Sequence, residues 1–417
     1  MSLVLNTNIS SLQAQNNLTA SSNQLSTATE DLSSGLKINT AADNAAGYAI
    51  SQRFQTQIGG LGQASENASD AINLAQTAGS ALSQITSNLQ SIRDLAVQAA
   101  NGTYQASDRS AINTSVQQYL SEITRIANQT TFNGTNVLNG STSSLSFQIG
   151  ANVGQAINVQ LGQGVTTSQV GQVSEISTGD ISGAFLNASG VSGASVSLSG
   201  LAITGADGTS YTFSGSITAN SAQGVADAIN AAGIDGVSAA VNASGGINIY
   251  STGELAVNGA SVTGASAASA ASGSFANFTS GALAFGASGV GTSASGFASS
   301  GVAYTAGNVI QASGSLTGGD VLSVDDANQL IARVDAALTT VSTFSSNLGA
   351  VQNRFQSAIS TLSAQQTNLT ASQSSIQDTD FAATTAQLSQ AQVLQQAGIS
   401  VLATANSEPQ NILKLLQ

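Results

Sequence analysis

Apolar residues in the last quarter of the chain recur at an interval of seven. They are Val334, Val341, Leu348, Phe355, Leu362, Leu369 and Ile376, and the second position of the repeat is polar at Ser345, Gln352, Gln366 and Gln373. This heptad spacing is typical of helices that pack along a continuous line of contact, or seam. It predicts one helix from about Asp325 to Ile376, roughly 75 Å long at about 1.5 Å per residue. Partner helices are needed to cover the apolar seam of this helix.

A matching stripe lies in the first part of the chain, with apolar residues three and four positions apart. The stripe consists of Ala68, Ala71, Ala75, Ala78, Leu82, Ile85, Leu89, Ile92, Ala96 and Ala99. Alanine lets helices approach closely, whereas each buried Leu or Ile contributes about 1.5–3 kcal/mol. The pattern predicts a second long helix that ends at "NGTYQASD" (101–108) and a third helix to about Ala127. An ordinary antiparallel bundle is the alternative on periodicity alone.

A β-hairpin is expected after the third helix. "FNGTNVLNG" (132–140) contains two Asn-Gly turn signals, and "LSFQIG" (145–150) and "INVQL" (157–161) alternate apolar and polar residues. Further along, residues 166–320 are rich in Gly, Ala, Ser and Thr and also alternate. This zone is therefore predicted to be a β-rich region inserted between two helical zones.

Both ends of the chain have helical spacing without charge. Residues 1–29 and 381–407 contain no charged side chain, although exposed helices normally carry many. The repeating positions are Leu18, Leu25 and Leu32 near the start, and Ala391, Leu394, Gly398, Val401 and Ala405 near the end. Because these apolar faces are thin, the end helices are expected to be weakly ordered alone and to order when chains associate.

The stretch "SSGLKINTAADNAAGYAIS" (33–51) joins the first end helix to the long helix that follows. Gly35 is expected to end the first helix, and Asn39 or Thr40 to cap the next one. Its small side chains would let chains pack closely at the joint.

The predicted fold is mainly α, of the α+β class. Both chain ends form a long antiparallel coiled-coil rod with a β-hairpin, and a variable β-rich outer region is inserted in the middle. The expected domains are an N-terminal end helix (1–43), N-terminal rod helices with the hairpin (44–168), the β-rich outer region (169–320), a C-terminal rod helix (321–377) and a C-terminal end helix (378–417).

Composition excludes most catalytic chemistry. The 417 residues include no His, Cys or Trp, so a histidine-based triad, a thiol nucleophile and an ordinary zinc site are ruled out. The acids are sparse and not clustered at metal-ligand spacing. A carboxylate-only enzyme remains possible on composition alone, but we predict no enzymatic activity, no catalytic residue, no metal and no cofactor.

Charge and hydropathy restrict the partners further. The net charge is −13 and residues 166–320 contain no Lys or Arg, which argues against nucleic acid and anionic membranes. The absence of an eighteen-residue apolar run argues against membrane insertion. "MSLVLNTNISSLQ" lacks the features of a cleavable signal peptide, so the chain is expected to stay in the cytoplasm or to be secreted without a classical signal.

Several motifs resemble bacterial flagellin, the subunit of the flagellar filament. At the front these are "LNTNISSLQAQNNL", "LSSGLKINTAADNAAGYAIS", "SIRDLAVQAANGT" and "QTTFNGTNVLNG". At the back they are "RVDAALTTVSTFSSNLGAVQNRFQSAI" and "QDTDFAATTAQLSQAQVLQQAGISVLATANSEPQNILKLL". The resemblance is collinear and covers both helical zones. In the middle, "AQGVADAINAAGIDGVSAAVNASGGINIYS" resembles a module of flagellin variable regions only weakly.

The resemblance implies a secreted, extracellular filament subunit that supports swimming motility. The end helices would line the inner tube, with core packing by Leu18, Leu25, Leu32, Leu394, Gly398 and Val401. The rod helices would form the outer tube, with a seam of Leu82, Ile85, Leu89, Ile92, Val334, Val341, Leu348, Phe355, Leu362 and Leu369. The implied route is unfolded export through the flagellar type III apparatus, which a cysteine-free chain tolerates.

The implied partners are other copies of the chain in a helical homopolymer, an export chaperone at the C-terminal helix, and the filament cap and hook-junction proteins. Toll-like immune receptors recognise some flagellins around the "LAVQ" helix. Arg93 and Leu95 match two recognition positions, whereas Ser91 and Ser115 replace an arginine and a glutamate. For Arg93, Asp94 and Leu95, contact between subunits is therefore favoured over receptor contact.

Two alternatives remain at the level of sequence. One is a hook–filament junction protein, which has similar end helices. The other is a filament-borne adhesin that uses residues 166–320. A metallopeptidase carried on the filament is excluded, because its HExxH motif requires histidine.

Overall fold

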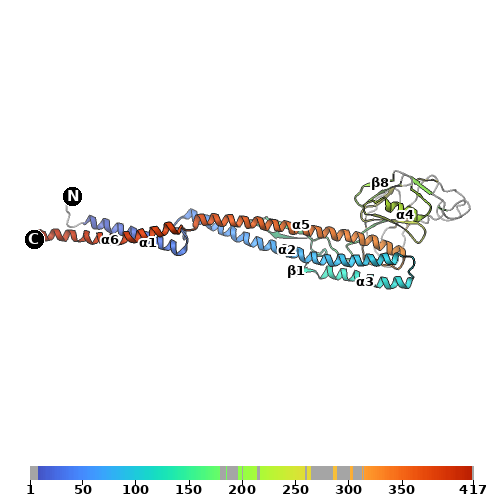
Figure 1. The fold of residues 1–417 in the computed structure, drawn as a ribbon, viewed down its shortest axis with the longest axis horizontal. Helices are drawn as coiled ribbons and strands as arrows, with labels where there is room; N and C mark the ends of the chain where they lie inside the picture. Colours follow the sequence, from blue (N-terminus) through green and yellow to red (C-terminus); the bar gives the residue numbers. More distant parts are fainter. Residues whose placement is uncertain are drawn as a thin grey trace. The chain divides into compact units, whose positions relative to one another are not determined.

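A computed structural model describes residues 8–178, 185, 196–199, 201–213, 217–258, 261–263, 285–288, 301–303, 312 and 314–415. Its helices are α1 (Ile9–Ser34), α2 (Ala45–Ala100), α3 (Ala106–Gln129), α4 (Ala222–Ala231), α5 (Val324–Gln377) and α6 (Phe381–Leu415). The chain is mainly helical with a β-rich centre, which confirms the predicted fold class (Figure 1). It divides into two compact units, each built from separate stretches of sequence: Met1–Ser69, Gln148–Ile157 and Gln356–Gln417 in the first, and Asp70–Phe147 and Asn158–Phe355 in the second.

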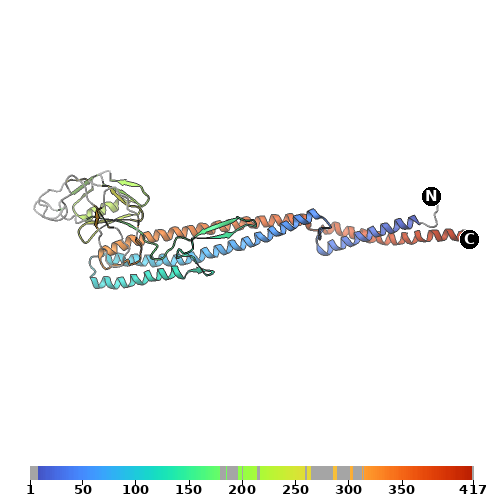
Figure 2. The same cartoon turned by 180° about the vertical axis from the view of Figure 1, so that it is seen from behind.

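In the first unit, the two ends of the chain lie side by side. Helices α1 and α6 pair along their lengths (Figures 1 and 2). The neighbouring parts of α2 and α5 share a small apolar cluster in which Leu61 and Ala64 pack against Leu362, with Leu369 partly buried beside them. Helices from opposite chain ends are therefore partners throughout this unit.

In the second unit, the rod helices α2, α3 and α5 bury the apolar stripes expected from the sequence. The α2 residues from Ala71 to Ala99 on the stripe are at most 1% exposed. Val116, Ile123 and Ala127 of α3 are fully buried. On α5, Ser345 was expected at the second seam position of its heptad. Ser345 is exposed, and the preceding residue, Phe344, is buried in the seam instead. The expectation for Ser345 was therefore wrong.

Two hairpins follow α3. Strands β1 (Thr131–Phe132) and β2 (Thr135–Asn136) are joined by Asn133-Gly134, whose φ angles of 48° and 77° are those of a type I′ turn. Strands β3 (Ser144–Gln148) and β4 (Ala156–Gln160) form the predicted longer hairpin. Phe147 of β3 packs edge-on against Phe355 of α5, with ring centroids 5.7 Å apart, which places the hairpin on the rod.

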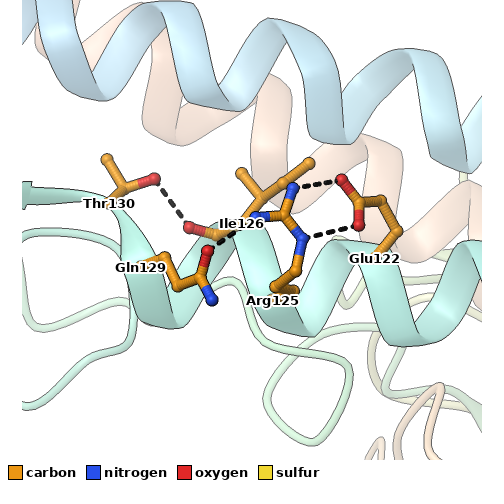
Figure 3. Close-up of polar contacts among 5 residues, drawn as sticks. All are labelled: Glu122, Arg125, Ile126, Gln129 and Thr130. Carbon is orange, nitrogen blue, oxygen red and sulfur yellow. Dashed lines mark hydrogen bonds and ion pairs between the residues drawn. The ribbon is translucent and has the colours of Figure 1, made fainter.

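The outer side of α3 carries polar contacts (Figure 3). Arg125 donates to both carboxylate oxygens of Glu122 at 2.7 and 2.5 Å and to Gln129 Oε1 at 2.6 Å. The Thr130 hydroxyl donates to the Ile126 carbonyl at 2.6 Å and closes the helix end. Because Arg125 and Glu122 are exposed, this ion pair contributes little to stability.

The β-rich region is assembled from short antiparallel strands. The strands are β5 (Ser174–Thr178), β6 (Val196–Ser199), β7 (Ala202–Thr204), β8 (Ser210–Thr212), β9 (Ile217–Ala219), β10 (Val237–Val241), β11 (Ile247–Ser251), β12 (Ala256–Asn258), β13 (Ser261–Thr263), β14 (Phe285–Ser288) and β15 (Gly301–Ala303). They form a five-stranded sheet in the order β10-β11-β5-β14-β15 and the three-stranded sheets β12-β7-β8 and β13-β6-β9.

Helix α4 packs beside strand β10 at the edge of the five-stranded sheet. Asn230 donates from Nδ2 to the Ala239 carbonyl at 2.8 Å and accepts from the Ala239 N–H at 2.7 Å. One side-chain amide therefore satisfies backbone groups that an edge strand would otherwise leave unpaired.

Polar residues cap the N-termini of α1, α2 and α6. Asn8 and Asn44 accept from backbone N–H groups three residues later, at 3.0 and 2.9 Å, and Asp380 accepts from Ala382 and Ala383 at 3.0 and 3.2 Å. The cap of α2 is thus Asn44, and the expectation of Asn39 or Thr40 was wrong. Gly35 ends α1 with φ 76°, as predicted.

The rod seam yields a stability prediction. Leu89→Ala should lower the free energy of unfolding by about 2–5 kcal/mol, because Leu89 is fully buried and the truncation leaves a cavity. Leu394→Ala is the matched control: its side chain is 46% exposed, and surface truncations usually change stability by about 0.5 kcal/mol or less. Denaturant unfolding followed by circular dichroism measures both. Equal effects would contradict the assignment of Leu89 to the core.

Candidate functional site

The candidate site is the pair of end helices, α1 and α6. On α1, buried small residues alternate with half-buried leucines at intervals of three and four. The small residues are Ser11, Ala14, Ser21 and Ala28, and the leucines are Leu18, Leu25 and Leu32. The three leucines of the sequence prediction thus lie on the face of α1 that contacts α6.

On α6, the contact face runs through Thr384, Leu388, Ala391, Gln395, Gly398, Leu402 and Ala405. Gly398 lies against α1, since a Cβ atom there would come within 3.3 Å of Leu18 Cδ1. Leu394 and Val401, which the sequence pattern placed on the same stripe, are instead 46% and 56% exposed. Within one chain, the neighbouring residues Gln395 and Leu402 occupy the seam.

Hydroxyl and amide groups bond across this narrow seam. Ser21 Oγ donates to the Ala391 carbonyl at 3.0 Å, and Ser11 Oγ donates to Asn406 Oδ1 at 2.7 Å. Asn8 Nδ2 donates to the Ala405 carbonyl at 2.8 Å. The two helices are therefore held by close approach and neutral hydrogen bonds rather than by a large apolar core.

The outward faces of both helices carry large apolar side chains. They include Ile9 and Leu12 of α1 and Phe381, Val393, Leu394, Ile399 and Val401 of α6. At about 100° per residue, Leu394 and Val401 flank the seam on one side, Ile399 flanks it on the other, and Val393 lies opposite. The sequence reading followed one stripe and missed Val393 and Ile399. The uncharged run that contains them was the available signal.

The turns that precede α2 and α6 are bonded to each other. Leu36 and Asp378 form an antiparallel bridge. The Lys37 N–H donates to the Gln377 carbonyl at 2.8 Å, and the Thr379 N–H donates to the Gly35 carbonyl at 3.0 Å. Both joints are thus fixed by backbone hydrogen bonds within the first unit.

Asp43 organises the turn before α2. One carboxylate oxygen accepts from the backbone N–H groups of Asn39 and Thr40 at 3.0 and 2.8 Å. Hydrogen bonds from the backbone N–H groups of Thr40 and Asn39 hold the pKa of Asp43 below its usual value, and the bond from Thr40 has the larger effect. The ionised carboxylate therefore stabilises this turn.

The rod residues singled out in the sequence lie as follows. Leu82, Ile85, Leu89, Ile92, Val334, Val341, Leu348, Phe355 and Leu362 are buried, and Leu369 is half-buried. Arg93 Nε donates to Asp335 Oδ1 at 2.7 Å. Asp94 is exposed and Leu95 is half-buried. Arg93 is thus paired with Asp335 of the same chain, whereas Asp94 lies on the surface.

Among the residues that the structure describes, no helix is both long and apolar enough to cross a membrane. Groups of three or more acidic side chains placed to hold a metal ion are also absent from that part of the chain.

Comparison with known proteins gives consistent matches. A family model of the bacterial flagellin N-terminal helical region matches residues 5–143, and one of the bacterial flagellin C-terminal helical region matches residues 331–416. The B-type flagellin of Pseudomonas aeruginosa is 37% identical over 499 positions, and a flagellin of Salmonella typhimurium is 34% identical over 496, each covering 100% of both chains. The solved structure of FliC from Burkholderia pseudomallei is 26% identical with a TM-score of 0.37, covering 68% of this chain and 99% of that one.

The Asp43 turn should loosen in acid. Its folded pKa is below the ordinary value of 3.8, so its stabilisation is present above pH 3.8 and is lost as the pH falls through the lowered pKa. Hydrogen exchange of the Asn39 and Thr40 amides, corrected for intrinsic rates, should show protection at pH 6 that declines in this acid range. Asp43→Asn should reduce the protection at pH 6 and remove the pH dependence. A parallel decline in the variant would refute the role of the carboxylate.

Proposed function

The chain belongs to the bacterial flagellin family, and from that premise we propose that the α1–α6 pair is the surface through which copies pack in the filament core. Flagellin is the structural subunit of the extracellular flagellar filament, which serves motility, and it is not an enzyme. Self-assembly follows from the family. The relatives matched over their full length are flagellins, which favours the filament subunit over a junction protein.

The observation that supports this packing is a helix pair that is apolar on several sides and carries no charged side chain over residues 9–29 and 381–407. Val393, lying opposite the seam, is 67% exposed, and each apolar side chain of this size contributes about 1.5–3 kcal/mol when fully buried. A single contact face would cover only one flank of α6. Apolar groups around the helix instead favour an environment in which neighbouring copies surround it.

We also infer that assembly adds order to the α1–α6 pair. Its seam consists of small or polar residues and half-buried leucines, and helical stability in proteins comes mainly from packing of an apolar face. We therefore propose that α1 and α6 gain most of their stability from other copies, whereas the rod helices are stable in the single chain.

The flagellin family implies more specific partners, for which α6 offers an exposed surface. Before assembly, α6 presents Leu394, Ile399 and Val401 to solvent, and an export chaperone bound to the C-terminal helix would cover such groups. Cap and hook-junction proteins would contact the end helices at the two ends of a filament. The Arg93–Asp335 ion pair supports a structural role for Arg93, and exposed Asp94 is proposed to contact another subunit.

A charge on the outward face of α6 should abolish assembly. Leu394→Asp or Val401→Asp would place an unpaired charge inside the packed core, at a cost of several kcal/mol. Electron microscopy of purified variants should show no filaments. Tyr211→Asp is the control, because Tyr211 is 43% exposed but lies in the β-rich region, and this variant should polymerise normally. Filaments from Leu394→Asp would contradict the proposed packing.

Removal of either chain end should separate folding from assembly. Deletion of residues 1–30 or 385–417 should leave the rod helices folded, because their buried seam lies outside the deleted segments. Circular dichroism should show a cooperative helical transition, and electron microscopy should show no long filaments. Normal filaments from either deletion would refute the assignment of the end helices to the core.

A further inference from the structure

The β-rich region rests on the first turns of α5 through a small apolar contact. Val173 and Tyr250 pack against Ala332 and Ala336 of α5, with Ala240 beside them. The two alanines are one helical turn apart and present the same small surface. Such a contact is tolerant of a shift along the helix, because each turn offers a similar methyl group.

Polar residues on α5 distinguish one turn from the next. Asp325, Gln329 and Arg333 are spaced by four residues, and each bonds a different part of the region above. Asp325 Oδ2 accepts from the Ala243 N–H at 2.8 Å. Gln329 Nε2 donates to Glu175 Oε2 of β5 at 2.7 Å. Arg333 Nη1 donates to the Ser315 carbonyl.

Glu175, Gln329 and Arg333 are buried, at 7%, 7% and 5% exposed. Burial raises the pKa of Glu175, opposed by the Gln329 hydrogen bond and the Arg333 charge. Burial lowers the pKa of Arg333, opposed chiefly by Glu175. Among the described residues, Arg333 Nε and Nη2 have no hydrogen-bond partner. Buried ionic groups of this kind are weak sources of stability, but they discriminate between arrangements.

We propose that Asp325, Gln329 and Arg333 form a register key that holds the β-rich region at one position along α5. A one-turn shift toward the start of α5 would place Glu175 opposite Asp325, a like charge. A one-turn shift the other way would bring Glu175 opposite Arg333, an opposite charge, but it would leave the Ser315 carbonyl opposite Ala337, which has no side-chain donor. A like-charge contact penalises the first shift, and an unpaired buried carbonyl penalises the second.

Gly171 reinforces the same position. It adopts φ 80°, and a Cβ atom there would lie 3.0 Å from the Arg333 carbonyl oxygen and 2.7 Å from Leu316 Cγ. The chain thus passes close to α5 at the turn that carries Arg333. The register key acts within one chain, so the outcome of its test does not depend on the assembly proposed above.

The test compares register with stability in the full chain. The sequence has no cysteine, so Ser238→Cys on β10 and Thr339→Cys on α5, both exposed, provide two unique spin-label sites. Pulsed electron paramagnetic resonance should give one narrow distribution of the distance between the two spin labels in the chain that carries only these two substitutions. The apolar triple variant Glu175→Leu, Gln329→Leu and Arg333→Met should add a second population shifted by about 5 Å, one helical turn.

The triple variant should remain folded, because apolar replacement of a buried polar cluster is often neutral for stability. Hydrogen-exchange protection of β5 and β11 measures this. The control is Arg125→Met with Glu122→Gln, which removes the exposed pair of Figure 3 and should leave the distribution narrow. A narrow, unshifted distribution in the triple variant would overturn the proposal. Loss of β5 and β11 protection would also overturn it, since the polar groups would then supply stability rather than register.

Discussion

The fold depends on one spacing rule: helices from opposite chain ends must offer each other a small or apolar residue every three or four positions. Between Ala68 and Ala78 of α2 the rule is met by alanines, and from Leu82 to Ile92 by larger residues. Because each heptad repeats the contact, the pairing is specified locally along the helix. The segment between α3 and α5 can then carry a β-rich region without disturbing the rod.

The same spacing rule explains which parts of the fold were predictable. Long heptad runs predicted the rod helices, and Gly35 and Asn133-Gly134 marked a helix end and a turn through their backbone requirements. The error at Val401 arose because two adjacent residues both suited the pattern. Val401 and Leu402 are both apolar, and only the packing partner decides which one faces α1. The α2 cap was misplaced because Asn39, Thr40 and Asn44 are all good caps.

The β-rich region could be recognised by composition but not resolved into sheets. Its strands are short, and β5 pairs with β11 across more than a third of the region. The bond between Glu175 and Gln329 joins residues 154 positions apart. Local periodicity does not predict such distant partners. A polar residue in a strand, such as Glu175, is predicted to face solvent unless the helix that buries it is known.

The absence of charge from residues 9–29 of α1 and 381–407 of α6 has a consequence for the medium in which the filament works. Attraction between exposed ions fades beyond about 8 Å at physiological ionic strength, whereas burial of apolar groups is not weakened by dissolved salt and is strengthened by some salts. Residues 9–29 and 381–407 offer no ions to screen. Rising salt concentration therefore does not weaken the cohesion between these stretches through ionic screening.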